Sequence, residues 1–346
     1  MVDMSKNGKI ILIFYILILS IAEGKTQVQR HRTTTLMGCR FDFTVIAEDS
    51  LHAEKYIDQA IDEVVRIDNL ISDWKSESQI SKVNQNAGIR PVKVDREVLE
   101  LTRRAIYISE ITHGAFDISF AAIDKIWKFD GSMKHVPSPN QIKKSIKKIG
   151  YKNIILDTIN STIFLKLAGM KIGFGSIGKG YAADKAKEVL VYKKVKAGII
   201  NASGDISVWG SRLNRENWKI GIVNPFVPSD IIGAFSLKEE CVTTSGSYEK
   251  FVELEGKRYS HIIDPRTGYP VKGILSVSVV GPKTEMANGF STSIMVLGTQ
   301  KGIELINHFP DYGCLIITDE GELIKSKNFN TKIELYDSEI KPTPKS

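Results

Sequence analysis

Residues 171–181 read Lys171-Ile-Gly-Phe-Gly-Ser-Ile-Gly-Lys-Gly-Tyr181, and this glycine-rich segment joins two contrasting patterns. A β-branched run at 162–167 comes before it, and a helical pattern at 178–191 follows it. Gly173, Gly175 and Gly178 match Gly-x-Gly-x-x-Gly, in which glycine lets backbone N–H groups approach a phosphate at a helix N-terminus. The segment therefore predicts a strand-to-helix turn that either holds a phosphate or simply packs tightly.

The lysine at the start of this helix favours the phosphate-binding alternative. Lys179 would be repelled by the positive end of the helix dipole unless an anion lay nearby. The dinucleotide-binding version of the motif fits poorly, because no acidic residue follows about twenty positions further on. The P-loop version fails because Gly180 stands where serine or threonine is required. We expect a phosphate-bearing ligand of another class.

Composition places the chain among ordinary globular proteins. Of 346 residues, 42% are hydrophobic and 25% are charged, which argues against wholesale disorder and against a polytopic membrane protein. The net charge of +7 is spread along the chain with no nucleic-acid-binding signature, so we expect no nucleic-acid partner. Cys39, Cys241 and Cys314 lie too far apart for a zinc motif, and their odd number excludes a fully paired disulfide framework. One disulfide or three free thiols both remain open.

The N-terminus has the pattern of a secretory signal. Lys6 and Lys9 precede an apolar run at 10–19, and small residues follow it. We interpret residues 1–24 as a signal peptide or an N-terminal anchor and residues 25–36 as a polar linker. The chain is therefore expected to be exported.

The remaining chain predicts one α+β domain over 37–335, followed by a tail at 336–346. Apolar spacing predicts helices at 51–71, 96–111, 137–149, 178–191 and 286–308. Short β-branched runs predict strands at 154–157, 162–167, 198–201, 218–223, 232–238, 251–254, 274–280 and 313–318. Helices therefore dominate the first half of the chain and sheet the second, with no internal repeat.

Several further motifs are ambiguous when each is taken alone. Trp74 lies in a polar loop, where it favours an exposed stacking surface. His261 precedes two apolar residues near a strand end and could accept a hydroxyl proton, although a structural role is more common. Asn288, Ser291 and Thr292 share one helix face, and their oxygens could bind a hard cation. That face has no carboxylate, so capping and packing remain an alternative. The segment Asn201-Ala-Ser-Gly-Asp205 is typical of a plain turn.

In chain order, these motifs resemble the ApbE family of flavin transferases. The resemblance extends from Met37 to about Leu297. It rests on the following segments: the serines Ser72, Ser78 and Ser81 around Trp74; Gly114-Ala-Phe-Asp117; Gly175-Ser-Ile-Gly-Lys-Gly-Tyr-Ala-Ala-Asp184; Asn201-Ala-Ser-Gly-Asp-Ile206; Ser245-Gly-Ser-Tyr-Glu249; His261-Ile-Ile-Asp-Pro-Arg-Thr-Gly268; and Ala287-Asn-Gly-Phe-Ser-Thr292.

The resemblance implies a single domain of the T-fold type, with mixed or antiparallel sheets and flanking helices. It also implies an exported, Mg²⁺-dependent enzyme on the periplasmic side of the inner membrane, with association to that membrane as a further expectation. Such enzymes cleave FAD and attach its FMN half to a threonine of an acceptor flavoprotein. Some members mainly hydrolyse FAD to FMN and AMP.

The resemblance also implies roles for individual residues. FAD would contact Met37, Trp74, Ala115, Phe116, Asp117, Gly173, Lys179 and Ile263. The metal would be held by Ser176, Asn288, Ser291 and Thr292. His261 would activate the acceptor hydroxyl, and Lys179 would lie beside the phosphates and assist catalysis.

Two departures from the family pattern remove negative charge. Asn288 and Gly173 each stand where the family has an aspartate, and the aspartate at the first position is a metal ligand. Three activities are therefore in competition: FMN transfer, FAD hydrolysis, and flavin binding without turnover.

Overall fold

A large antiparallel sheet forms the centre of the molecule. The computed structural model describes residues 27–336. Its eight-stranded sheet has the order β1 (Val28–Leu36), β2 (Cys39–Ala47), β6 (Ala197–Ala202), β7 (Asp205–Trp209), β10 (Cys241–Gly246), β13 (Ile274–Gly281), β14 (Gly313–Thr318) and β15 (Leu323–Lys325). Every pair of neighbouring strands in this sheet is antiparallel.

Three smaller sheets surround the large one. One has the order β16 (Ile333–Leu335), β9 (Ile231–Leu237) and β8 (Trp218–Val223). Another has the order β3 (Val92–Lys93), β5 (Thr162–Leu165) and β4 (Ile154–Asp157). The third is the hairpin of β11 (Phe251–Leu254) and β12 (Lys257–Ser260).

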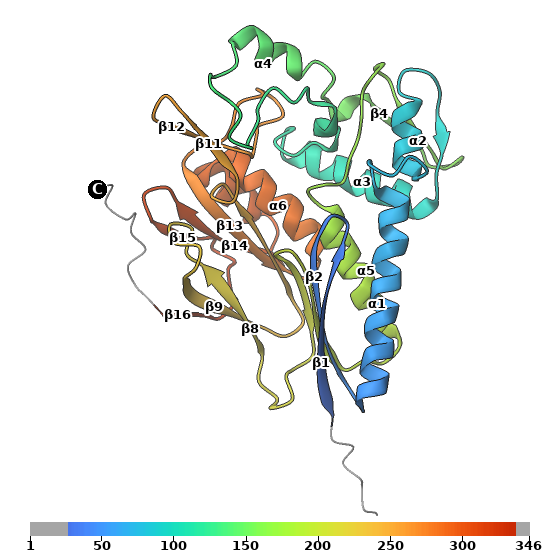
Figure 1. Ribbon diagram of the computed structural model, residues 1–346, viewed down its shortest axis with the longest axis vertical. Coiled ribbons are helices and arrows are strands. Elements are labelled where there is room, and N and C mark those ends of the chain that lie inside the picture. The colour runs from blue at the N-terminus through green and yellow to red at the C-terminus, as the bar shows by residue number, and fades with distance from the viewer. Residues whose placement is uncertain (1–26, 337–346) are drawn as a thin grey trace, which may run out of the picture.

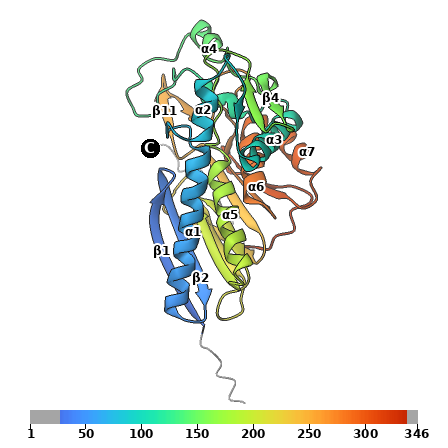
Figure 2. The same ribbon diagram turned by 90° about the vertical axis from the view of Figure 1, so that its right-hand side faces the viewer.

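Helices cover one face of the large sheet, and the β16–β9–β8 sheet covers the other (Figures 1 and 2). The described residues form the helices α1 (Ser50–Ile71), α2 (Gln79–Gln85), α3 (Arg96–Ile111), α4 (Pro139–Ser145), α5 (Gly178–Tyr192), α6 (Thr284–Leu297) and α7 (Thr299–Ile306). Of these, α1, α5, α6 and α7 contact the large sheet directly. Alternation along β2 makes this layering possible, because successive strand residues face opposite sides. Phe43 and Val45 pack in the core that includes α1 and α5, whereas Ile46 packs in the core beneath β8 and β9.

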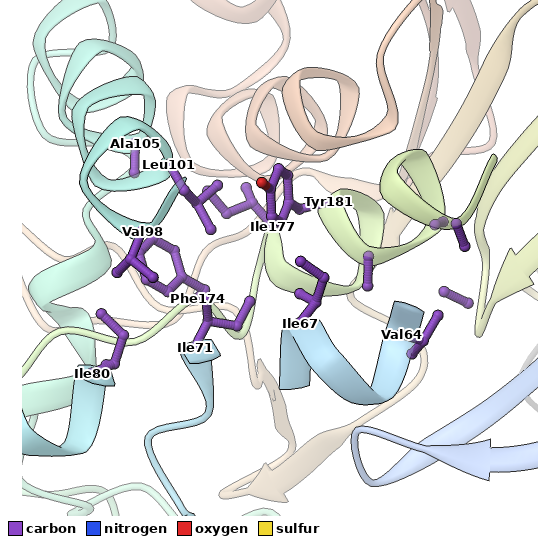
Figure 3. Close-up of a cluster of buried hydrophobic side chains, with 14 of the residues drawn as sticks. Val64, Ile67, Ile71, Ile80, Val98, Leu101, Ala105, Phe174, Ile177 and Tyr181 are labelled. Atoms are coloured by element: carbon purple, nitrogen blue, oxygen red, sulfur yellow. The ribbon is translucent and has the colours of Figure 1, made fainter. Parts of the chain in front are cut away.

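The glycine-rich segment before α5 is anchored in the helical core. Figure 3 shows Phe174 and Ile177 among side chains from α1, α2 and α3, including Ile67, Ile71 and Val98. Phe174 is 3% exposed and Ile177 is fully buried. These two apolar residues fix the segment, and this determines where its glycines lie.

The α+β prediction is confirmed. All eight predicted strands correspond to observed ones, namely β4, β5, β6, β8, β9, β11, β13 and β14, whereas the other eight strands of the described residues were not predicted. The predicted linker at 25–36 is wrong over residues 28–36, because these form β1 at the edge of the large sheet. Its Arg32 forms ion pairs with Glu54 and Asp58 of α1. A polar strand is expected at an exposed edge, where charge discourages pairing with other molecules, and its polarity made it look like a linker.

Two predicted helices also differ from those observed. The helix at 137–149 is shorter, since α4 covers only Pro139–Ser145. The helix at 286–308 is in fact α6 and α7, separated at Gly298. Gly298 has φ +81°, which glycine adopts readily and which ends a helix. Within residues 27–336, no helix combines the length and apolarity needed to cross a membrane. The predicted signal or anchor at 1–24 lies outside the described residues.

Candidate active site

A cavity of about 470 Å³ lies where the glycine-rich segment, the start of β7, the end of β10 and helix α6 meet. All the predicted site residues line it except Met37 and Ser291. Those that do are Trp74, Ala115, Phe116, Asp117, Gly173, Ser176, Lys179, His261, Ile263, Asn288 and Thr292. These residues come from sequence positions more than two hundred residues apart, and the fold brings them to one place.

The glycine-rich segment forms one wall of this cavity. Its Gly173 N–H donates to the Ile118 carbonyl at 3.0 Å. Gly175 and Ser176 line the cavity, and a Cβ on Gly175 would meet no other heavy atom within 4 Å. Gly180 has a different role, because a Cβ there would come within 2.9 Å of the Thr284 carbonyl oxygen of α6. Glycine at 180 therefore lets α5 and α6 approach closely.

Lys179 has a protein anion beside it. Its Nζ lies 3.1 Å from Oδ2 of Asp205, the first residue of β7. Burial alone would lower the pKa of Lys179, but the Asp205 carboxylate outweighs burial, so the pKa lies above its ordinary value. As expected for a lysine at a helix start, an anion lies beside Lys179. However, the chain itself supplies one, so the lysine alone does not demonstrate a phosphate ligand.

Asp205 is placed by the tight turn between β6 and β7. Asn201 Oδ1 accepts a hydrogen bond from the Gly204 N–H at 2.8 Å, and both turn residues, Ser203 and Gly204, have positive φ. The Asp205 side chain is almost fully buried, with 4% exposed, and lines the cavity. Burial raises the pKa of Asp205 to about 6, although Lys179 opposes this shift. The segment predicted to be a plain turn therefore delivers a buried carboxylate to the site.

Helix α6 brings neutral oxygen atoms to the same place. Asn288 and Thr292 line the cavity, and the Asn288 amide lies near enough to the Asp205 carboxyl to lower its pKa, against the larger effect of burial. Ser291 does not line it. This side chain is fully buried, and its hydroxyl lies 2.9 Å from that of Ser245 in β10. The position of Ser291 therefore does not support the metal-ligand role expected for it. Asn288 and Thr292 reach the cavity from α6, whereas Ser291, on the same side of the helix, packs against β10.

A buried carboxylate sets the position of α6. The Asp184 carboxylate of α5 accepts hydrogen bonds from the Thr284 N–H at 3.1 Å, the Thr284 hydroxyl at 2.6 Å and the Glu285 N–H at 3.1 Å. These contacts satisfy N–H groups at the start of α6, which have no partner within the helix. Helix α6 is therefore held against α5, with Asn288 one turn along.

His261 lies directly after β12 at the edge of the cavity. Its Nδ1 is 2.9 Å from the Lys250 carbonyl oxygen. A carbonyl can only accept, so Nδ1 carries the hydrogen and Nε2 keeps its lone pair in the neutral ring. Burial lowers the pKa of His261 below its ordinary value, which favours this neutral form. The geometry suits a proton acceptor.

The cavity lining also includes an exposed aromatic ring. Trp74 is 81% exposed and lines the cavity, and the Lys125 ammonium lies 4.9 Å from its ring centroid. Phe116 and Ala115 supply buried apolar surface nearby. The Asp117 carboxylate is occupied by the Ser119 N–H and hydroxyl and by the Tyr151 N–H, so it acts as a cap.

Comparison with known families gives one decisive result. A family model described as the ApbE family matches residues 37–316. The chain belongs to the ApbE family.

Curated relatives and solved structures agree with the ApbE assignment. The chain is 29% identical over 289 residues to an FAD:protein FMN transferase of Klebsiella pneumoniae, covering 83% of this chain and 90% of that protein. It is 30% identical over 287 residues to one of Treponema pallidum, covering 78% of each. The crystal structure of an ApbE protein of Thermotoga maritima superimposes with a TM-score of 0.79 at 29% identity, covering 87% of this chain and 98% of that one. An apo flavinyl transferase ApbE of Pseudomonas stutzeri gives 0.77 at 25% identity, covering 88% and 96%.

Met37 lies close to this ApbE site without lining its cavity. It is in the turn between β1 and β2, with φ +50°. Its Cε would lie 3.8 Å from a Cβ placed on Gly178, at the start of α5. The structure therefore places Met37 as packing behind the glycine-rich segment, and any contact with a ligand stays a prediction.

Sequence reasoning missed three carboxylates of the site. Besides Asp205, the cavity is lined by Glu249 and Asp73. Asp73 Oδ2 lies 3.0 Å from the position that a Cβ on Gly173 would take, so a carboxylate stands beside this glycine. Glu249 closes the Ser245–Glu249 motif, which gave a usable signal. Nothing in the local sequence pointed to Asp73.

Proposed function

We propose that this chain transfers FMN from FAD to a threonine hydroxyl of an acceptor flavoprotein and releases AMP. One observation carries the proposal: a single cavity contains an exposed aromatic, a cation at a helix start and a histidine with a free Nε2. Homology to FAD:protein FMN transferases over most of the chain supports it.

Different side chains of the cavity suit different parts of FAD. The exposed Trp74 ring offers a stacking surface for a flat heterocycle. Lys179 and the N–H groups at the start of α5 offer positive charge for the pyrophosphate. The volume of about 470 Å³ is in the range of small-molecule sites, and FAD would extend beyond the cavity along its open side.

The transfer step needs a nucleophile, its base and a leaving group. The threonine Oγ forms a bond to the phosphorus of the FMN half, and the bond from that phosphorus to the bridging oxygen breaks. AMP leaves with the bridging oxygen, and His261 Nε2 takes the hydroxyl proton. Lys179 offsets the negative charge that accumulates on the phosphoryl oxygens.

The donors at the site also fit a hard divalent cation such as Mg²⁺. Side-chain oxygens of Asn288 and Thr292 line the cavity together with Ser176, whose backbone carbonyl we assign as a further ligand. The described residues contain no group of three or more His, Cys, Asp or Glu side chains placed to hold a metal, which fits Mg²⁺ better than zinc. When bound, Mg²⁺ neutralises charge on the phosphates.

We also propose that the protein acts after export, on the periplasmic side of the inner membrane. The signal-like pattern at residues 1–24 supports this location. Because the threonine acceptor would have to be exported too, the partner is expected among exported or membrane-bound flavoproteins.

Covalent labelling of an acceptor tests the proposal. The purified mature chain is incubated with FAD, Mg²⁺ and an exported flavoprotein domain, and gels are inspected for flavin fluorescence after denaturation. Fluorescence is expected with the wild-type acceptor and should vanish when its threonine is changed to alanine. The neutral Asn288 favours a second candidate, flavin binding without turnover, which would give FAD binding with neither labelled protein nor AMP.

A further inference from the structure

Asp205 has an unusual environment for a carboxylate. It is buried at the start of β7, yet its Oδ2 makes no hydrogen bond of good geometry. Its nearest positive charge is Lys179 Nζ at 3.1 Å, and this contact compensates the negative charge of Oδ2 without the geometry of a hydrogen bond. A buried anionic oxygen is costly unless a cation compensates it fully, so Oδ2 of this cavity-lining side chain keeps an unused capacity to bind a cation.

The neighbouring donors are neutral. Asn288 lies beside Asp205, and its side-chain amide lowers the pKa of that carboxyl as a hydrogen-bond donor does. An aspartate at 288 could not donate this hydrogen bond without a proton, whereas an amide can. Because donation uses the amide nitrogen, the oxygen of Asn288 stays available to a cation. The two side chains together offer oxygen ligands with one negative charge, and that charge is on β7.

We propose that Asp205 is the anionic ligand of the divalent cation in this chain, and that Lys179 holds the position of that cation until it binds. This inference rests on the divalent cation of the proposed function. Cation binding would then free the Lys179 ammonium for the phosphates of the nucleotide. Lys179 thereby stabilises the Asp205 carboxylate while the site is empty, and it offsets the charge of the phosphates once the cation has bound.

The other carboxylates of the cavity are less suited to this role. Asp73 lies against Gly173, on the Trp74 side of the cavity. Glu249 lines the cavity and influences both Lys179 and Asp205 electrostatically, but it hydrogen-bonds to neither. Asp205 alone contacts both the lysine and the α6 donor Asn288.

Binding of Mn²⁺ without nucleotide gives a direct test. Mn²⁺ accepts the same oxygen ligands, and its free concentration can be followed by electron paramagnetic resonance. Asp205→Asn should weaken Mn²⁺ binding by about 10- to 100-fold, as loss of a coordinating or supporting group does. Lys179→Met should tighten it by about fivefold or more, because the ammonium competes with the metal for one carboxylate. Opposite signs are the key result, since a purely structural ion pair would give weaker binding in both variants.

Control variants separate metal binding from folding. The double variant Asp205→Asn/Lys179→Met removes both charges together, so it should fold, as judged by circular dichroism, and should bind Mn²⁺ as weakly as Asp205→Asn. Asp73→Asn should bind Mn²⁺ like the wild type. Wild-type affinity in the double variant, or weaker binding in Lys179→Met, would overturn the proposal. Because no FAD is present, a failure of the transferase proposal would leave this measurement unaffected.

Discussion

Replacing Asn288 with aspartate should change stability in opposite directions with and without Mg²⁺. The variant places a second carboxylate against Asp205, whose only close cation is Lys179. Two like charges about 4 Å apart repel by about 4 kcal/mol at an effective dielectric constant of about 20. Lys179 and solvent offset part of this repulsion, so we expect a net loss of about 1–3 kcal/mol in the free energy of unfolding without metal.

The metal should reverse this penalty. A hard divalent cation gains more from an anionic oxygen than from an amide oxygen. The Mg²⁺ concentration that gives half-maximal FAD turnover should therefore fall by about tenfold, which corresponds to about 1.4 kcal/mol.

Two assays on the same preparations check both halves of this prediction. Thermal unfolding is recorded for the wild type and Asn288→Asp in EDTA and in saturating Mg²⁺, and FAD turnover is titrated with Mg²⁺. Asn288→Ala serves as a control, since it removes the hydrogen bond without adding charge, and it should lower stability in both media. Identical Mg²⁺ midpoints for the wild type and Asn288→Asp would refute the placement of residue 288 beside the metal.

Three further substitutions test other parts of the site. Trp74→Ala should weaken FAD binding by about 1–3 kcal/mol without changing the unfolding temperature, because the exposed ring adds little to the core; an unchanged dissociation constant from calorimetry would rule out stacking there. His261→Gln should abolish protein labelling but keep FAD affinity. Because burial lowers the pKa of His261 and transfer needs the neutral ring, the wild-type rate should fall on the acidic side only below pH 6.5, and a fall that begins above pH 6.5 would point to another base. Phe174→Ala should cost about 3–5 kcal/mol in urea unfolding by opening a cavity between α1 and α3; a loss below about 1 kcal/mol would mean that this side chain does not anchor the glycine-rich segment.

Local periodicity predicted much of the fold, because burial imposes a repeat on both helices and strands. It identified β8 at 218–223 and β11 at 251–254 with the observed bounds. It failed to predict β1, because the residues of β1 are mostly polar and show no apolar repeat. They form a strand through pairing with β2 and contact with α1. It also merged α6 and α7, because the apolar spacing continues across Gly298 although the helical backbone conformation is interrupted there.

Local sequence identified residues whose exposure is visible locally, as with Trp74, which is exposed in its polar loop and lines the cavity. It was missed where the role depends on distant partners. Asp205 looks like the end of a turn, and only the pairing of β7 between β6 and β10 brings it to Lys179 and Asn288. Ser291 illustrates the limit of helical spacing, because it shares a face with Asn288 and Thr292 but packs against Ser245 of β10.

The ratio of released AMP to protein-bound FMN tests the central proposal most directly. The full mature chain is incubated with FAD, Mg²⁺ and an acceptor flavoprotein; AMP is quantified by chromatography and covalent FMN by intact mass. One AMP per FMN attached to the acceptor threonine is the predicted result, with both products lost in His261→Gln. AMP and free FMN without labelled acceptor would contradict transfer and identify a hydrolase, and FAD binding without AMP would contradict catalysis altogether.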